Sequence, residues 1–143
     1  MKWLDSSLKQ QIKGVNFLIM SDDKILIQKR DFNTKKYPNC YAIPGGGIDT
    51  GETPLMAVVR EVFEETDMNL SPTDFVHLGN FCYLMDKKLR VNSLYICFVE
   101  NPNIVSKEGT MIWMTQIEVS SVKLARNTNV LLPKIFKFIK AIL

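Results

Sequence analysis

A glycine-rich turn followed directly by a helix is the feature that most restricts how this chain can fold. Gly45, Gly46 and Gly47 interrupt a short β-prone run, which predicts a turn because glycine adopts backbone conformations closed to other residues. Thr53 suits a helix N-cap, and Pro54 suits the first helical position. The run LMAVVREVFEET then predicts a helix of about three turns. Strand, glycine turn and helix are therefore expected to follow one another without a linker.

The predicted helix concentrates negative charge on one side. At about 100° of rotation per residue, Glu65 lies near 40° and Glu64 near −60° from Glu61. Ala57 falls in the same arc and adds no side chain that could cover it. The apolar positions expected to pack on a sheet lie beside this arc: Leu55, Val59 and Val62. We therefore expect an open acidic face next to the packing stripe, and for the helix taken alone an ordinary solvated face is the alternative.

An open face of carboxylates offers ligands for a hard divalent cation. Mg²⁺ and Mn²⁺ prefer oxygen ligands, and Mg²⁺ combines carboxylates with water and substrate phosphate oxygens. Arg60 lies one helical turn before Glu64 and offsets part of the repulsion within the face. The helix therefore points to metal-dependent phosphoryl chemistry.

The remaining segments predict strands on both sides of this unit and a second helix near the C-terminus. Alternating and β-prone residues predict the strands, and polar clusters between them predict the turns. The expected strands are 11–20, 24–29, 41–44, 75–85, 89–100 and 110–114, with a loop at 31–40 and an amphipathic helix at 129–143. This order fits a domain of the α/β or α+β class.

Length and charge limit the number of domains and the class of partner. The chain has 143 residues, which supports one domain. Its formal net charge of +3 is too small to indicate a nucleic-acid or membrane partner, although anionic small substrates remain compatible. The first apolar run is too short for a signal sequence or a membrane span, so nothing is expected to direct the chain outward.

Cysteine and histidine usage argues against disulfide and zinc sites. Cys40, Cys82 and Cys97 are odd in number and lack CxxC spacing, which indicates neither a disulfide framework nor a zinc site. His77 is the only histidine, and its place in FVHLG predicts an ordinary strand residue. A reducing, cytoplasmic setting is the simplest expectation.

The glycine turn and the helix together resemble the signature of a known family. The spacing is Gly46, five residues, Glu52, seven residues, Arg60-Glu61, two residues, Glu64-Glu65. This pattern resembles the Nudix box, the signature of hydrolases that act on a nucleoside diphosphate linked to another moiety. The stretches PGG, GETP and AVVRE also look like those of MutT-type members. The resemblance implies a single Nudix domain over 1–143, with a mixed β-sheet sandwiched between helices.

One residue departs from the box. Asp67 stands where the family has a glycine, at the end of the helix. Glycine often takes a left-handed conformation there, and aspartate is among the few other residues that tolerate a positive φ. We expect a small stability cost and an intact site, unless Asp67 lengthens the helix or turns toward the acidic face.

The resemblance also implies roles within the box. Gly46 and Gly47 would let the loop backbone approach phosphate or metal. Arg60 would orient the acidic residues by charge-assisted hydrogen bonds. Glu52 would stabilise the glycine loop without binding the metal itself. The metal ligands that it implies are Glu61, Glu64, Glu65 and the carbonyl of Gly45.

Three positions outside the box resemble functional residues, and each has a plain structural alternative. Glu108 is similar to an acidic loop residue that approaches the metals, or is a loop glutamate beside a turn glycine. Asn127 is similar to the base-contacting asparagine of MutT-like enzymes, or caps the last helix, a role that Asn129 fills equally well. Arg30 is similar to a basic residue that meets substrate phosphates, or ends a strand at a solvated edge. As general base, we favour Glu61 over Glu108.

The reaction and substrate class follow from the same resemblance. It implies a Mg²⁺-dependent enzyme, with Mn²⁺ as a substitute, that splits a normal or oxidised nucleoside triphosphate into a nucleoside monophosphate and pyrophosphate. Dinucleoside polyphosphates, ADP-ribose and nucleotide sugars are alternative substrates, and capped RNA is a minor one. Tyr83 lies where dinucleoside-polyphosphate enzymes carry a tyrosine, or is a plain sheet aromatic. A noncatalytic nucleotide sensor is the alternative of another class, and both a monomer and a homodimer are open.

Overall fold

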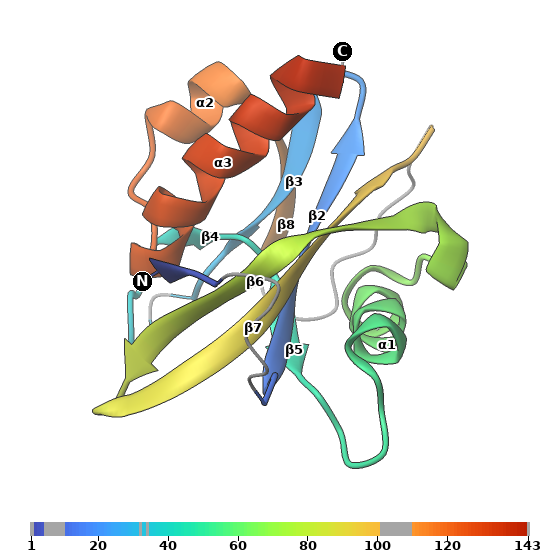
Figure 1. Cartoon of the computed structure of the whole chain (residues 1–143). Helices are drawn as coiled ribbons and strands as arrows, with labels where there is room; N and C mark the ends of the chain where they lie inside the picture. Colours follow the sequence, from blue (N-terminus) through green and yellow to red (C-terminus); the bar gives the residue numbers. More distant parts are fainter. Residues whose placement is uncertain (1, 5–10, 32, 34, 101–109, 143) are drawn as a thin grey trace.

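A computed structural model describes residues 2–4, 11–31, 33, 35–100 and 110–142 of the chain. Their strands form one mixed β-sheet, with α1 (Pro54–Thr66) on one face and α2 (Gln116–Ser120) and α3 (Arg126–Ile142) on the other (Figure 1). A short 3₁₀ turn, Pro72–Asp74, follows α1. None of the helices in these ranges is long and apolar enough to cross a membrane. The predicted α+β class, with a mixed sheet between helices, is confirmed.

The sheet contains eight strands within the described residues. They are β1 (Lys2–Trp3), β2 (Gly14–Ser21), β3 (Lys24–Lys29), β4 (Tyr41–Ala42), β5 (Gly45–Gly47), β6 (Phe75–Met85), β7 (Lys88–Phe98) and β8 (Thr110–Thr115). Their order is β1-β6-β7-β2-β3-β4, with β5 paired to β2 and β8 paired to β3. β2 and β7 run parallel, so residues 14–20 and 92–98 lie side by side in the centre of the sheet.

Alternation along the central strand sends apolar side chains into two separate cores. Val15, Phe17 and Ile19 of β2 pack with α1, whereas Leu18 and Met20 pack with residues of α2 and α3. Successive side chains of a strand point to opposite faces, so a strand buried on both faces reads as a continuous apolar run. The sheet is therefore a fixed support for the polar side chains at its ends.

Most predicted elements lie close to the observed ones. β3 and β6 have the predicted bounds, and Asp86 and Lys87 form the turn between β6 and β7, both with positive φ. α3 begins at Arg126, earlier than predicted, so the expectation that Asn127 or Asn129 caps it is wrong. α2 was not predicted, because a helix of five residues leaves no periodic pattern.

The glycine run is a strand and not the turn that the sequence suggested. β3 pairs with β2 only at Met20 and Ser21, which leaves the other end of this β2 edge open. β5 fills that edge, with Gly14 opposite Gly47 and Asn16 opposite Gly45. Backbone groups buried inside a protein need hydrogen-bond partners, and pairing with β5 supplies them. The glycines are thereby held at a fixed place in the sheet.

Candidate active site

Helix α1 begins and ends where the sequence predicts. The side chain of Thr53 accepts a hydrogen bond from the N–H of Met56 at 3.1 Å, and Pro54 follows as the first helical residue. At the other end, Asp67 adopts a left-handed conformation with φ of 62°, and its N–H donates to the carbonyl of Phe63 at 2.9 Å. Asp67 therefore takes the conformation for which glycine is preferred, and it does not lengthen the helix.

The acidic side of α1 is not the open face that the helical wheel suggested. Glu65 is only 3% exposed and lies at the centre of the buried arc of the helix. With Glu61 at 0°, this arc runs from Ala57 near −40° to Thr66 near 140°, at about 100° per residue. The wheel could not include the strand of glycines against which this side packs. Burial of the Glu65 carboxylate costs free energy unless a cation or hydrogen bonds compensate it.

Gly46 in β5 lies directly against the carboxyl group of Glu61. A Cβ atom added at Gly46 would overlap the carboxyl carbon and both oxygens of Glu61. At Gly47, by contrast, a Cβ atom would meet no other atom within 4 Å. The close approach of α1 and β5 therefore depends on the absence of a side chain at position 46.

Arg60 connects the acidic side of α1 to the segment between β5 and the helix. Its Nε and Nη2 donate to the two carboxylate oxygens of Glu52, at 2.8 Å each. Its Nη1 donates to Glu61 at 2.9 Å, and its Nη2 also donates to the carbonyl of Gly47 at 2.9 Å. A guanidinium is a rigid planar fork, so this pattern fixes Glu52, Glu61 and β5 relative to one another.

The charges of this network are strongly coupled. The hydrogen bonds from Arg60 and from the N–H of Asp49 lower the pKa of Glu52 to about 2. Glu52, and after it Glu61, raises the pKa of Arg60. Glu64 contacts Arg60 less closely, at 3.3 Å, and its side chain is 53% exposed. Glu52 and Arg60 are therefore both charged at neutral pH, whereas Glu64 extends toward solvent.

The carboxylates fit a divalent cation in their chemistry but are not gathered around one point. Glu61 and Glu65 are hard oxygen ligands one helical turn apart, and the carboxyl group of Glu61 fills the space that a side chain at Gly46 would need. Within the described residues, no group of three or more His, Cys, Asp or Glu side chains is placed to hold a metal. Two of the predicted ligands, Glu61 and Glu65, thus lie on one side of α1, whereas Glu64 accepts a hydrogen bond from Arg60.

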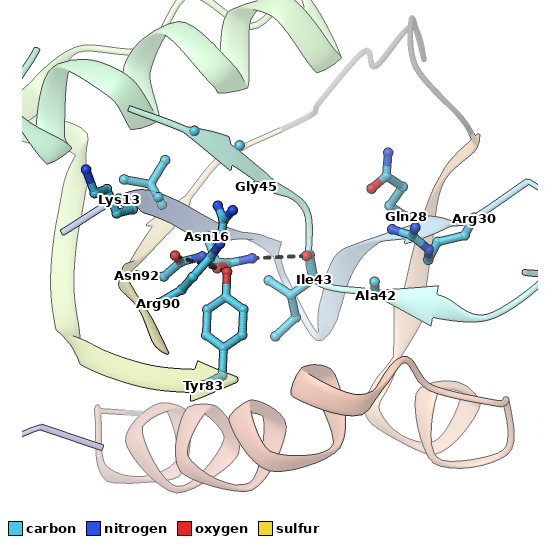
Figure 2. Close-up of a pocket in the computed structure, with 14 residues that line it drawn as sticks. Lys13, Asn16, Gln28, Arg30, Ala42, Ile43, Gly45, Tyr83, Arg90 and Asn92 are labelled. Carbon is cyan, nitrogen blue, oxygen red and sulfur yellow. Dashed lines mark hydrogen bonds between the residues drawn. The ribbon is translucent and has the colours of Figure 1, made fainter. Parts of the chain in front are cut away.

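A polar pocket of about 260 Å³ borders β5 (Figure 2). The glycines of β5 form part of its wall, together with side chains from β2, β6 and β7. Its basic side chains are Lys13, Arg30 and Arg90, and its neutral polar side chains include Asn16, Tyr83 and Asn92. Cations in the wall of a cavity attract anionic ligands. The pocket and the acidic side of α1 therefore share one strand and carry opposite charges.

The family described as the NUDIX domain matches residues 11–134. The chain belongs to the Nudix family of hydrolases. This confirms the resemblance found in the box, and the match extends from before β2 into α3. Nudix hydrolases generally use divalent metals, in agreement with the oxygen ligands on α1.

Curated relatives match shorter parts of this Nudix chain. An ADP-ribose pyrophosphatase of Methanocaldococcus jannaschii is 48% identical over 55 residues, covering 38% of this chain and 31% of the relative. An RNA pyrophosphohydrolase of Blochmanniella floridana is 38% identical over 58 residues, covering 38% of this chain and 37% of the relative. The matches thus span about a third of the length of each relative.

A solved Nudix structure resembles nearly the whole chain. The NUDIX domain of Shewanella oneidensis NrtR, complexed with ADP ribose, has a TM-score of 0.74 and 18% sequence identity. The similarity covers 95% of this chain and 94% of that one. At this identity the likeness shows the fold alone.

The positions predicted outside the Nudix box lie in different places. Arg30 lies on the polar pocket, and its Nε donates to the carbonyl of Lys36 at 3.0 Å. Asn127, in the first turn of α3, lines a second cavity of about 350 Å³. Tyr83 lies in the walls of both cavities, so its description as a plain sheet aromatic is incomplete. Glu108 falls outside the described residues.

Several residues of the polar pocket could not be predicted from the resemblance to the Nudix box. They are Lys13, Asn16, Arg90 and Asn92. Asn16 carried a usable signal, because it is a polar residue inside the apolar run GVNFLIM of a central strand. Asn92 carried none, since its neighbours are set by the parallel pairing of β7 with β2.

Proposed function

We propose that this chain is a divalent-metal-dependent pyrophosphohydrolase that cleaves a nucleoside diphosphate linked to another group. The contact between Gly46 and the carboxylate of Glu61, at the border of a pocket with basic side chains, carries this proposal. Carboxylates suited to a cation and cations suited to phosphate oxygens meet at β5. Hydrolysis of a polyphosphate needs both, because its oxygens must be neutralised while a water molecule attacks.

The proposed cofactor is Mg²⁺, with Mn²⁺ as its substitute, because the available ligands are oxygens. When bound, such a cation neutralises phosphate oxygens and lowers the pKa of water. Glu61 and Glu65 would hold it, and Glu64 would join them if its contact with Arg60 opened. Glu61, oriented by Arg60, is the proposed general base, and Glu108 is the alternative expected from the sequence.

The basic side chains of the polar pocket are proposed to hold the phosphates. Lys13 and Arg30 lie toward opposite ends of the cavity and Arg90 lies between them, as Figure 2 shows. Gly46 and Gly47 line this pocket and are proposed to bring the main chain of β5 close to a phosphate group, with open space beside Gly47. A substrate bound in this way would lie beside Gly46, the residue that contacts the carboxyl group of Glu61.

The proposed substrate is a normal or oxidised nucleoside triphosphate, with a nucleoside monophosphate and pyrophosphate as products. ADP-ribose is a second candidate, favoured by the 48% identity to a relative named for that activity. The second cavity, which Tyr83 shares with the polar pocket, offers space for a further group beyond the diphosphate. Dinucleoside polyphosphates, nucleotide sugars and capped RNA are further candidate substrates. A cytoplasmic setting is proposed with this activity.

The experiment is a screen for released pyrophosphate and phosphate in the presence of Mg²⁺ or Mn²⁺. The substrates are the normal and oxidised nucleoside triphosphates, ADP-ribose, dinucleoside polyphosphates, nucleotide sugars and capped RNA. The screen is run with the wild type, Glu61→Gln and Glu65→Gln. We expect metal-dependent cleavage of one substrate class and a loss of at least about 100-fold in both variants.

The matched control is Glu100→Gln. Glu100 is exposed and follows the last residue of β7, Phe98. This variant removes the same charge and should retain the wild-type rate. Cleavage that survives in both site variants would contradict the proposal. If the wild type cleaves nothing while a nucleotide still raises its melting temperature, the chain is a noncatalytic nucleotide sensor and the proposed activity is wrong.

A further inference from the structure

A chain of side-chain hydrogen bonds crosses the floor of the polar pocket (Figure 2). It begins at the main chain before β5, where Nδ2 of Asn16 lies 3.4 Å from the carbonyl oxygens of both Ile43 and Pro44. A main-chain carbonyl only accepts hydrogen bonds, so the amide of Asn16 must present its NH₂ group to this side. The orientation of Asn16 is thereby fixed, and its Oδ1 faces the other way.

The direction of every following hydrogen bond is set by this first one. Nδ2 of Asn92 donates to Oδ1 of Asn16 at 2.8 Å, which leaves Oδ1 of Asn92 as an acceptor. The hydroxyl of Tyr83 donates to that oxygen at 3.3 Å. Among the described residues, Asn92 is the hydrogen-bond partner of the Tyr83 hydroxyl. The hydroxyl proton therefore points toward Asn92, and the oxygen lone pairs remain available to a ligand.

The backbone makes room for this arrangement. In the parallel pairing of β2 with β7, Gly14 lies beside Asn92. A Cβ atom at Gly14 would come within 2.7 Å of Oδ1 of Asn92 and 3.1 Å of its Cγ. A side chain at position 14 would therefore displace the oxygen that receives the Tyr83 proton.

Tyr83 differs in this respect from the other side chains that can meet a ligand here. Lys13 and Arg90 only donate hydrogen bonds and suit phosphate oxygens. Arg90 lies directly across from Tyr83 in the β6–β7 pairing, so the two side chains reach the same region. A ligand acceptor facing Tyr83 would have to compete with Asn92 for its proton, whereas a ligand donor finds a free lone pair.

We propose that Tyr83, held as an acceptor by Asn92 and Asn16, determines specificity by selecting substrates that present an N–H or O–H group at this position. The group is an amino group of the base or a hydroxyl group of the sugar. The inference rests on the proposed function, because it names the feature by which that site would distinguish one nucleotide from another. It assigns to Tyr83 a role in recognition and not in the chemical step.

The test compares pairs of nucleotides that differ by one donor group. ATP against purine riboside triphosphate and GTP against ITP each remove an amino group of the base, and ATP against 2′-deoxy-ATP removes a sugar hydroxyl. Both kcat/KM with Mg²⁺ and the dissociation constant without metal are measured, the latter by calorimetry. We expect the wild type to prefer the donor-bearing member of at least one pair by about tenfold.

Two variants and one control make the result specific. Tyr83→Phe removes the hydroxyl but keeps the ring that contacts Phe81, and Gly14→Ala displaces Asn92 without altering the tyrosine. In both variants the two members of each pair should react about equally well. The loss of preference should appear in KM and not in kcat. Tyr41→Phe, which removes a hydroxyl outside the polar pocket, should keep the wild-type preference.

Each outcome separates this inference from the proposed function. Equal preference in the wild type and Tyr83→Phe for every pair, or no preference at all in the wild type, overturns the role of Tyr83 even if hydrolysis is found. A wild type that binds with the expected preference but hydrolyses nothing overturns the proposed function and leaves the role of Tyr83 standing.

Discussion

The carboxyl group of Glu61 occupies the space that a side chain at Gly46 would need. A helix and a strand usually keep their distance through their side chains, but here the strand contributes none. The main chain of β5 therefore reaches a carboxylate that Arg60 also holds at 2.9 Å. The orientation of the Glu61 side chain on α1 therefore depends on the absence of a side chain at Gly46 in β5.

Gly46→Ala is predicted to lower kcat by about 100-fold, because an added Cβ must move the Glu61 carboxylate or shift β5, and small displacements of reacting groups carry costs of this size. Steady-state kinetics checks this, with circular dichroism to show that the variant folds. Gly47→Ala should cause a smaller loss, since its Cβ meets no atom within 4 Å. Equal rates in Gly46→Ala and the wild type would show that the position of Glu61 is not critical.

Arg60→Lys is predicted to lower kcat/KM by about 10 to 100-fold, the usual cost of losing a residue that orients metal ligands. Lysine keeps the charge but has no planar fork, so it cannot bind Glu52 at both oxygens and also reach Glu61 and the Gly47 carbonyl. Kinetics and thermal unfolding measured together test this. A variant with unchanged kcat/KM and unchanged melting temperature would mean that charge alone is sufficient.

The pair of Glu52 and Arg60 is predicted to make stability depend on pH in the acid range. In the folded protein the pKa of Glu52 is lowered from 4.5 to about 2 by Arg60. A carboxyl with a lowered pKa stabilises the fold fully above its unfolded pKa and loses this contribution as the pH falls through its folded pKa. The stability difference between the wild type and Glu52→Gln should therefore be constant above pH 4.5 and shrink toward pH 2.

Urea unfolding of both proteins between pH 2 and pH 7 measures this difference directly. The comparison is made at the pH values where both proteins remain folded without urea. A difference that does not change below pH 4.5 would contradict the lowered pKa of Glu52.

The sequence was sufficient for features that depend on neighbouring residues. Thr53, Pro54 and Asp67 set the ends of α1 through local hydrogen bonds and backbone preferences, so the helix and its Nudix box could be predicted. The bounds of β3 and β6 followed from short runs of β-prone residues.

Features that depend on distant pairing could not be predicted. The burial of Glu65 depends on how α1 packs in three dimensions, which a helical wheel does not include. The contact between Asn16 and Asn92 joins residues 76 positions apart and follows from the parallel register of β2 and β7. No local pattern fixes that register, so the polar pocket appeared only in three dimensions.

A divalent cation is predicted to stabilise the wild type through Glu65. This carboxylate is buried one helical turn from Glu61, and a bound cation that it helped to hold would offset the cost of its burial. A ligand that binds only the folded state at 100 times its dissociation constant stabilises it by about 2.7 kcal/mol. The melting temperature of the wild type should therefore rise with Mg²⁺ or Mn²⁺, and that of Glu65→Gln should rise much less. Glu100→Gln, which removes an exposed charge, should respond like the wild type. Equal rises in all three proteins would place the cation away from the acidic side of α1.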